Sequence, residues 1–251
     1  MLNYQQRGQG PDVILVHGLF GSLDNLGNLG RALEDAFTVT TVDLRNHGKS
    51  FHSEEMSLAA MAGDLLGLMD QLGIEKAHLV GHSLGGKVVM QLALNHPERV
   101  DKLVVADIAP VTYRHSNHDS VFAALTQVDP AQYQSRKEVE AAVAQHILEP
   151  GVRQFILKNL QKGDDGYYWR LNVPVLAHRY PDILQGPQGR PFSGPTLFIK
   201  GSESDYLTGD HAGAVQSLFP TAKLKVISGT GHWLHAEKPL VFNKLVRDFL
   251  S

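Results

Sequence analysis

The 251-residue sequence contains no cysteine, which excludes disulfide bonds, thiolate metal sites and a cysteine nucleophile. It also lacks a strong charge of either sign, because the net charge is −3 and no run of lysine or arginine exceeds two residues. This balance argues against a surface that binds nucleic acid or an anionic membrane. No apolar stretch approaches the roughly 18 residues needed to cross a bilayer.

The first residues, MLNYQQRGQG, do not place an apolar segment after a basic one, so no signal peptide is expected. We therefore expect a cytoplasmic protein without membrane insertion. Hydrophobic residues make up 43% of the chain and charged residues 20%, which is an ordinary globular composition. Such a chain is long enough to bury a sizeable core.

Short apolar runs alternate with helical patterns along most of the chain. Strands are expected at 13–16, 39–42, 77–80, 102–106, 196–199 and 224–227. Helices are expected at 58–72, 85–95, 212–219 and 239–250. This alternation predicts an α/β fold whose mostly parallel, doubly wound sheet is covered on both faces. Ligands of such sheets bind at the carboxyl ends of the strands, so functional residues should directly follow strands.

One long segment interrupts the alternation. Between Pro110 and Pro195 the sequence has amphipathic helical patterns but no clear strand. We expect residues 111–194 to form a helical lid inserted into the core. The core would then consist of a first part, residues 1–110, and a second part, residues 195–251.

The stretch GHSLG (81–85) matches the G-x-S-x-G pattern between an expected strand and an expected helix. A sharp turn there would expose the Ser83 hydroxyl to an imidazole, and the N–H of Leu84 would face a developing oxyanion. A turn that needs glycine only for its backbone is the alternative. The strand before it and the helix after it favour a nucleophile.

Two further glycine-rich loops follow expected strands. HGLFG (17–21) follows the first one, and the amide of Leu19 is the predicted second oxyanion donor. His17 is expected to fix this loop by hydrogen bonds. GTGHW (229–233) follows the last strand, where the glycines let the loop bring His232 inward as the predicted base.

Metal chemistry has little support in the sequence. His115 and His118 have a loose metal-like spacing, but apart from Asp119 no third ligand lies nearby in the sequence. We expect neither a metal nor an organic cofactor.

The four strings HGLFG, DLRNHGKS (43–50), GHSLGG (81–86) and GTGHW occur in this order, and with them the chain resembles the α/β-hydrolase superfamily over nearly its full length. Longer strings are similar to those of small bacterial esterases of the YbfF type; they are HGLFGSLDNLG (17–27), DIAP (107–110), WRLNVPVL (169–176) and HWLHAEKP (232–239). The resemblance implies an α/β-hydrolase fold with an inserted helical lid and a carboxylesterase-type serine hydrolase.

The resemblance leaves two aspartates in competition for the acid of a catalytic triad. The superfamily usually places this acid three residues after the glycine that follows a strand, which here is Ser204, with Asp205 next to it. The YbfF-type pattern instead uses the aspartate after the preceding strand, which is Asp107. We favour Asp107, and Asp205 remains the alternative because a loop can absorb a shift of one residue.

Together these features predict hydrolysis of a small-molecule carboxylic ester or acyl thioester by Ser83, His232 and Asp107. The lid would wall the acyl pocket together with four aromatic residues, each of which could equally serve only core packing: Phe20, Tyr113, Tyr206 and Trp233. A carbon–carbon bond hydrolase or lyase on the same scaffold and a non-catalytic ligand receptor remain alternative functions.

Overall fold

Seven strands form the central sheet of the computed structural model, which describes residues 1–114 and 117–251. The strands are β1 (Tyr4–Arg7), β2 (Asp12–Val16), β3 (Thr38–Val42), β4 (Ala77–His82), β5 (Val100–Ala106), β8 (Thr196–Gly201) and β9 (Lys223–Ile227). Their order is β1-β3-β2-β4-β5-β8-β9, and every neighbouring pair is parallel except β1 and β3. The mostly parallel α/β sheet predicted from the sequence is confirmed.

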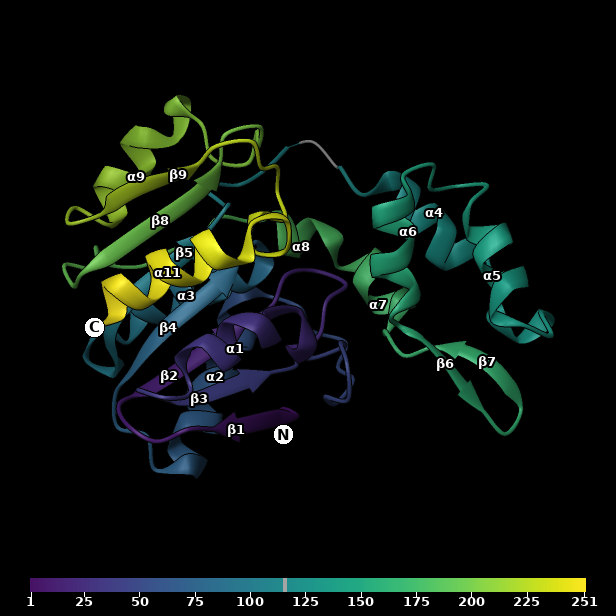
Figure 1. Cartoon of the computed structure of the whole chain (residues 1–251), viewed down its shortest axis with the longest axis horizontal. Helices are drawn as coiled ribbons and strands as arrows, with labels where there is room; N and C mark the ends of the chain where they lie inside the picture. The colour runs from purple at the N-terminus through teal and green to yellow at the C-terminus, as the bar shows by residue number, and fades with distance from the viewer. Residues whose placement is uncertain (115–116) are drawn as a thin grey trace.

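Helices cover both faces of this sheet (Figure 1). The helices of the core are α1 (Gly27–Leu33), α2 (Leu58–Leu72), α3 (Leu84–Asn95), α9 (Ala212–Leu218), α10 (Leu234–Glu237) and α11 (Pro239–Leu250). Apolar side chains of α1 and α11 form one buried cluster with one face of the sheet. Those of α2 and α3 form a second cluster with the other face, so the strands read as continuous apolar runs.

Helix α2 shows how directly the sequence sets these boundaries. The Ser57 hydroxyl oxygen accepts a hydrogen bond from the amide of Ala60 at the N-terminus, as an N-cap residue does. Gly73 ends the helix with a φ of 68°, a left-handed conformation that glycine adopts easily. The expected helix at 58–72 is confirmed.

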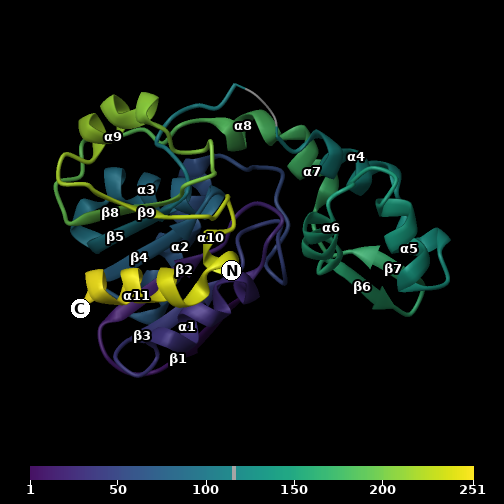
Figure 2. The same cartoon turned by 45° about the horizontal axis from the view of Figure 1, so that its top comes forward.

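The segment between β5 and β8 lies beyond the carboxyl ends of the parallel strands (Figures 1 and 2). It contains α4 (Asp119–Gln127), α5 (Arg136–Val143), α6 (Pro150–Leu157), β6 (Leu160–Gly163), β7 (Gly166–Trp169), α7 (Val173–His178) and α8 (Tyr180–Leu184). Strands β6 and β7 pair as an antiparallel hairpin, so the expectation of no strand here was wrong. The strand β6, with sequence LQKG, has one apolar residue and therefore no apolar run to reveal it.

Among the described residues, no helix combines the length and the apolar character that a membrane span requires.

Candidate active site

Ser83 lies at a sharp corner between β4 and α3. Its backbone has a φ of 52° and a ψ of −116°, a conformation that is rare for a residue with a side chain. The corner also presses α3 against β2, because a Cβ on Gly85 would lie 2.2 Å from the carbonyl oxygen of Val16. The glycine at position 85 is therefore required by close backbone approach, and Ser83 projects at the carboxyl end of β4.

Three side chains from the ends of three strands form one hydrogen-bonded chain. The Ser83 hydroxyl lies 3.0 Å from His232 Nε2, to which it donates. The other ring nitrogen of His232, Nδ1, donates to Asp107 Oδ2 over 2.7 Å. Asp107 directly follows β5, and His232 lies between β9 and α10. The structure thus brings together the serine, the histidine and the favoured aspartate of the sequence hypothesis.

The Asp107 carboxylate is fully buried and held by two further donors. The amide of Gly201 donates to Oδ1 over 3.0 Å, and the Ser204 hydroxyl donates to Oδ2. Such hydrogen bonds stabilise a buried carboxylate in its charged form. Asp205, the alternative acid, is exposed and has no hydrogen bond to His232 within the described part of the chain.

Sequence reasoning missed three of the contacts that hold this chain. Ser204 occupies the superfamily's usual acid position, yet it contributes a hydroxyl to Asp107. His82 Nε2 donates to the backbone oxygen of His232 over 2.8 Å. The Tyr206 ring stacks on the His232 ring at 4.0 Å with an interplanar angle of 25°. Both the backbone and the ring of His232 are therefore fixed.

Two backbone amides beside Ser83 have no partner in the described structure. The loop after β2 approaches the serine so closely that a Cβ on Gly18 would lie 3.2 Å from Ser83 Cβ. In this loop, the amide of Phe20 donates to His47 Nε2. The amides of Leu19 and Leu84 make no hydrogen bond to any described residue. They are the two amides that the sequence analysis assigned to the oxyanion.

His17 fixes this loop, as expected from the sequence. Its Nδ1 donates to the carbonyl oxygen of Gly18 over 2.7 Å, and its Nε2 accepts from the amide of Leu44 over 3.1 Å. Both ring nitrogens are used in these bonds, and the ring is buried. The expectation that His17 positions the loop is confirmed.

The cavity at Ser83 is small, with a volume of about 40 Å³. Of the four aromatic residues predicted to wall it, Tyr113 and Tyr206 do line it. Phe20 and Trp233 lie elsewhere: Phe20 contacts Phe122 edge to face, and the Trp233 ring lies 5.2 Å from that of Phe155. The complete lining is Leu19, Ser83, Leu84, Lys87, Ile108, Tyr113, Asn117, His118, Tyr180, Ile183, Leu184 and Tyr206.

Lys87 is an unexpected cation in this lining. It lies one turn after Ser83 on α3 and is 2% exposed. Its ammonium donates to the backbone oxygens of Ile183, Leu184 and Gln185 at the end of α8. Burial lowers the pKa of Lys87 to about 7. Lys87 therefore ties the helix that carries Ser83 to the inserted segment.

Among the described residues, no three histidine, aspartate or glutamate side chains form a group that could hold a metal ion. His118 lies in the cavity lining with its Nδ1 2.6 Å from the Tyr180 hydroxyl oxygen. The other half of the histidine pair considered from the sequence, His115, falls outside the described residues.

Comparisons with known proteins bear directly on this arrangement. The family described as alpha/beta hydrolase fold matches residues 11–239. The chain belongs to this family. Esterase YbfF of Escherichia coli (strain K12) is 43% identical over 247 residues, which are 98% of this chain and 96% of that protein. The sequence-based resemblance to the YbfF type is therefore confirmed.

Two further relatives of this α/β hydrolase are similar over most of their length. The sn-1-specific diacylglycerol lipase ABHD11 of Mus musculus is 41% identical over 96% of this chain and 81% of its own length. A solved structure described as a marine microorganism esterase is 38% identical, covers 99% of this chain and 98% of its own, and superposes with a TM-score of 0.96.

Buried histidines make the stability of this α/β hydrolase sensitive to acid. Burial lowers the pKa of His47 to about 3 and the pKa values of His118 and His235 to about 4, from an ordinary 6.5. Below pH 6.5 the unfolded chain binds protons that the folded chain does not, so the free energy of unfolding falls as the pH falls. Each histidine contributes about 1.4 kcal/mol per pH unit down to its folded pKa.

We expect His235→Leu to reduce the fall in the free energy of unfolding at acid pH. Its buried Nδ1 has no hydrogen-bond partner within the described residues, so leucine removes a proton-binding group without breaking a bond at that atom. Urea unfolding between pH 6.5 and 4.5 should show a slope smaller by about 1.4 kcal/mol per pH unit. His52→Gln, at an exposed site, is the control and should leave the slope unchanged. Equal slopes for both variants contradict the prediction.

Proposed function

We propose that this ester-hydrolysing enzyme cleaves carboxylic esters and acyl thioesters through an acyl-enzyme formed on Ser83. His232 acts as the general base and Asp107 as the carboxylate that orients it. The observation that carries the proposal is the continuous hydrogen-bonded chain from the Ser83 hydroxyl through His232 to Asp107. Ester cleavage is also the activity in the names of the relatives called esterase and lipase.

In the first half of the reaction, the Ser83 oxygen attacks the acyl carbon while His232 Nε2 takes the hydroxyl proton. This direction of transfer requires that Nε2 begin unprotonated. The bond from Nδ1 to Asp107 favours that tautomer and stabilises the imidazolium that forms. The tetrahedral intermediate collapses when the carbon–oxygen or carbon–sulfur bond of the leaving group breaks and His232 returns the proton to it.

The amides of Leu19 and Leu84 stabilise the negative charge that develops on the acyl oxygen. Both are free of other described partners, and both residues line the cavity at Ser83. Fixed donors of this kind need no reorganisation as charge develops. In the second half, His232 takes a proton from water, whose oxygen attacks the acyl-enzyme, and the acid leaves as Ser83 regains its proton.

The inserted segment acts as a lid in this proposal, with residues 111–194 placed between core parts 1–110 and 195–251. Support comes from the cavity lining, which takes residues from both the core and α8. A volume of about 40 Å³ is far below the roughly 300 Å³ at which ligand pockets begin. Entry of an ester therefore requires α8 or its side chains to move, as lids do.

Ile183→Ala should shift the preference toward longer acyl chains. Ile183 is buried on α8 and lines the cavity, so truncation opens space beside Ser83. We expect kcat/KM for a p-nitrophenyl hexanoate to rise at least threefold relative to the acetate. Ile156→Ala removes the same atoms from a buried site outside the cavity lining and should leave the ratio of the two esters unchanged. An equal change in both variants would show that the ratio reports only lid stability.

Steady-state turnover of p-nitrophenyl butyrate and of an S-butyryl thioester tests the reaction class. The proposal expects multiple turnovers of both substrates, with the acid and the alcohol or thiol released in equal amounts. A non-catalytic receptor would release neither product, and a dedicated carbon–carbon bond hydrolase or lyase would turn over both esters poorly. Either result contradicts the proposal.

A further inference from the structure

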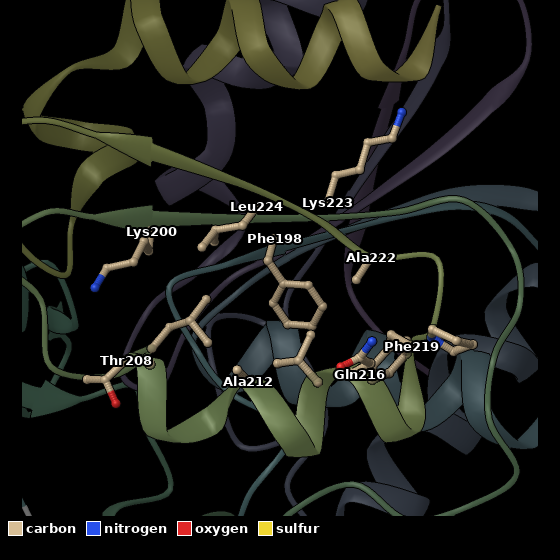
Figure 3. Close-up of a pocket in the computed structure, with 13 residues that line it drawn as sticks. Phe198, Lys200, Thr208, Ala212, Gln216, Phe219, Ala222, Lys223 and Leu224 are labelled. Carbon is tan, nitrogen blue, oxygen red and sulfur yellow. The ribbon is translucent and has the colours of Figure 1, made fainter.

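A second and larger cavity lies between α9 and the sheet (Figure 3). Its volume of about 400 Å³ falls within the range of about 300 to 1,000 Å³ that is typical of small-molecule sites. It contains none of Ser83, Asp107 and His232 among its lining residues. The two cavities meet at one short segment: Tyr206 lines the one at Ser83, and Leu207 and Thr208 line the larger one.

The wall formed by the sheet follows from the register of β8 and β9. Phe198 lies beside Leu224, and Lys200 lies beside Val226. Because side chains alternate along a strand, these four residues share one face. The Phe198 ring points toward α9 in Figure 3. The side chains of this wall are apolar except for that of Lys200, which lies near the carboxyl end of β8.

Helix α9 does not close the space above this wall. None of its residues is fully buried, although Ala212 and Val215 face the cavity. Leu224 on the opposite side remains 55% exposed. A sheet face lined by phenylalanine and leucine would ordinarily be sealed by its covering helix. Phe198 is 2% exposed and packs edge to face on the buried Phe219, so the part of the wall at Leu224 is left as an open apolar groove.

Lys200 places a positive charge at one end of this groove. Within the described residues its ammonium makes no hydrogen bond and no ion pair, and Figure 3 places it at one end of the cavity beside Thr208. Lys223 also borders the cavity, but it points away from α9 toward the other face of the sheet. An unpaired ammonium on a half-buried residue at the end of an apolar groove is complementary to a single anionic head on an apolar tail.

We propose that this cavity binds a single-chain carboxylate amphiphile. The tail lies between α9 and Leu224, with Phe198 at the base of the groove, and the carboxylate pairs with Lys200. The site is separate from the cavity at Ser83, so its occupation does not depend on the function proposed above. A carboxylate amphiphile is also the chemical class of acid that cleavage of a long-chain acyl ester releases, and that connection alone rests on the proposed function.

Titration calorimetry of the full chain with sodium decanoate tests the proposal. Decanoate should bind saturably, and Val215→Phe, which fills the groove, should weaken binding at least tenfold. Lys200→Met should weaken it about threefold to fivefold, as removal of one half-exposed ion pair does. Lys225→Met is the matched control, because Lys225 pairs with Ile199 in the row of residues that faces α11; it should change the affinity less than 1.5-fold.

Two other ligands isolate the head group. Decan-1-ol should bind the native chain and Lys200→Met equally, because it has no charge for the ammonium. Comparison of decyl phosphate with decanoate tests whether the site binds a phosphate or a carboxylate head group. Unchanged decanoate binding in both Val215→Phe and Lys200→Met overturns the site, and binding of decyl phosphate without decanoate overturns the carboxylate assignment. Ester turnover of the same variants should stay near that of the native chain, so failure here is separable from failure of the proposed function.

Discussion

Ser83→Ala lowers ester turnover by about 10⁴-fold or more, as expected for removal of a triad nucleophile. The hydroxyl is the only part of the side chain that alanine lacks, and its bond to His232 Nε2 is lost with it. Water must then attack without a covalent intermediate. The backbone at this corner keeps the same strained conformation, because alanine, like serine, carries a Cβ at a φ of 52°. Turnover of p-nitrophenyl butyrate and a thermal unfolding scan measure both effects.

Ser57→Ala is the matched control for this substitution. Ser57 caps α2 and accepts a hydrogen bond from the amide of Ala60, so its loss costs about 1 kcal/mol of folding free energy. Turnover should be unaffected, since the residue does not contact the site. Ser83→Ala is therefore expected to lose turnover and keep its stability, whereas Ser57→Ala is expected to lose stability and keep its turnover. Retention of more than a tenth of the activity in Ser83→Ala would remove Ser83 from the mechanism.

Asp107→Asn should lower turnover by about 10³- to 10⁴-fold. The asparagine amide would donate to His232 Nδ1, and that nitrogen would have to accept. The ring proton would then lie on Nε2, which faces the Ser83 hydroxyl and could no longer take its proton. The substitution also removes the negative charge that stabilises the imidazolium. Turnover measured at saturating ester reports the loss.

Asp205→Asn tests the competing acid with the same chemical change. Asp205 is exposed, and water screens its charge from the ring of His232. We expect a loss of less than about tenfold. If Asp205→Asn is the more damaging of the two, the acid lies at the superfamily's usual position and the assignment of Asp107 is wrong.

The sequence predicted well whatever depends on local pattern. Apolar runs located β2, β3, β4, β5, β8 and β9 to within two residues at each end. The edge strand β1, with sequence YQQR, was not predicted because a strand at an exposed edge needs no apolar run. In the hairpin, β6 (LQKG) also lacks an apolar run, whereas the three consecutive aromatic residues of β7 (GYYW) were not recognised as a strand.

The meeting of Ser83, Asp107 and His232 was predictable because all three follow parallel strands. The carboxyl ends of such strands converge at one edge of the sheet. Contacts of single polar side chains with distant segments are different, since no periodicity determines which segments touch. The hydroxyl of Ser204 on Asp107 and the ammonium of Lys87 on α8 are of this kind. Only their burial reveals them, and burial is a property of the folded chain.

The choice between Asp107 and Asp205 likewise depends on contacts that exist only in the folded chain. From the sequence, both lie in loops that follow neighbouring strands, and spacing alone could not separate them. In the structure, Asp107 is fully buried against His232 and Asp205 points to solvent. The difference arises from the short turn after Gly201, whose amide and Ser204 hydroxyl both point at Asp107.

The most direct test of the central claim is to identify the residue that an ester-like electrophile modifies. A fluorophosphonate with a short alkyl group reacts with an activated serine and is not released by water on the timescale of the assay. The account predicts one adduct per chain, located by peptide mass spectrometry on Ser83, with loss of ester turnover in proportion to labelling. Full turnover in a completely labelled sample, or an adduct on another residue that accounts for the lost activity, would contradict it.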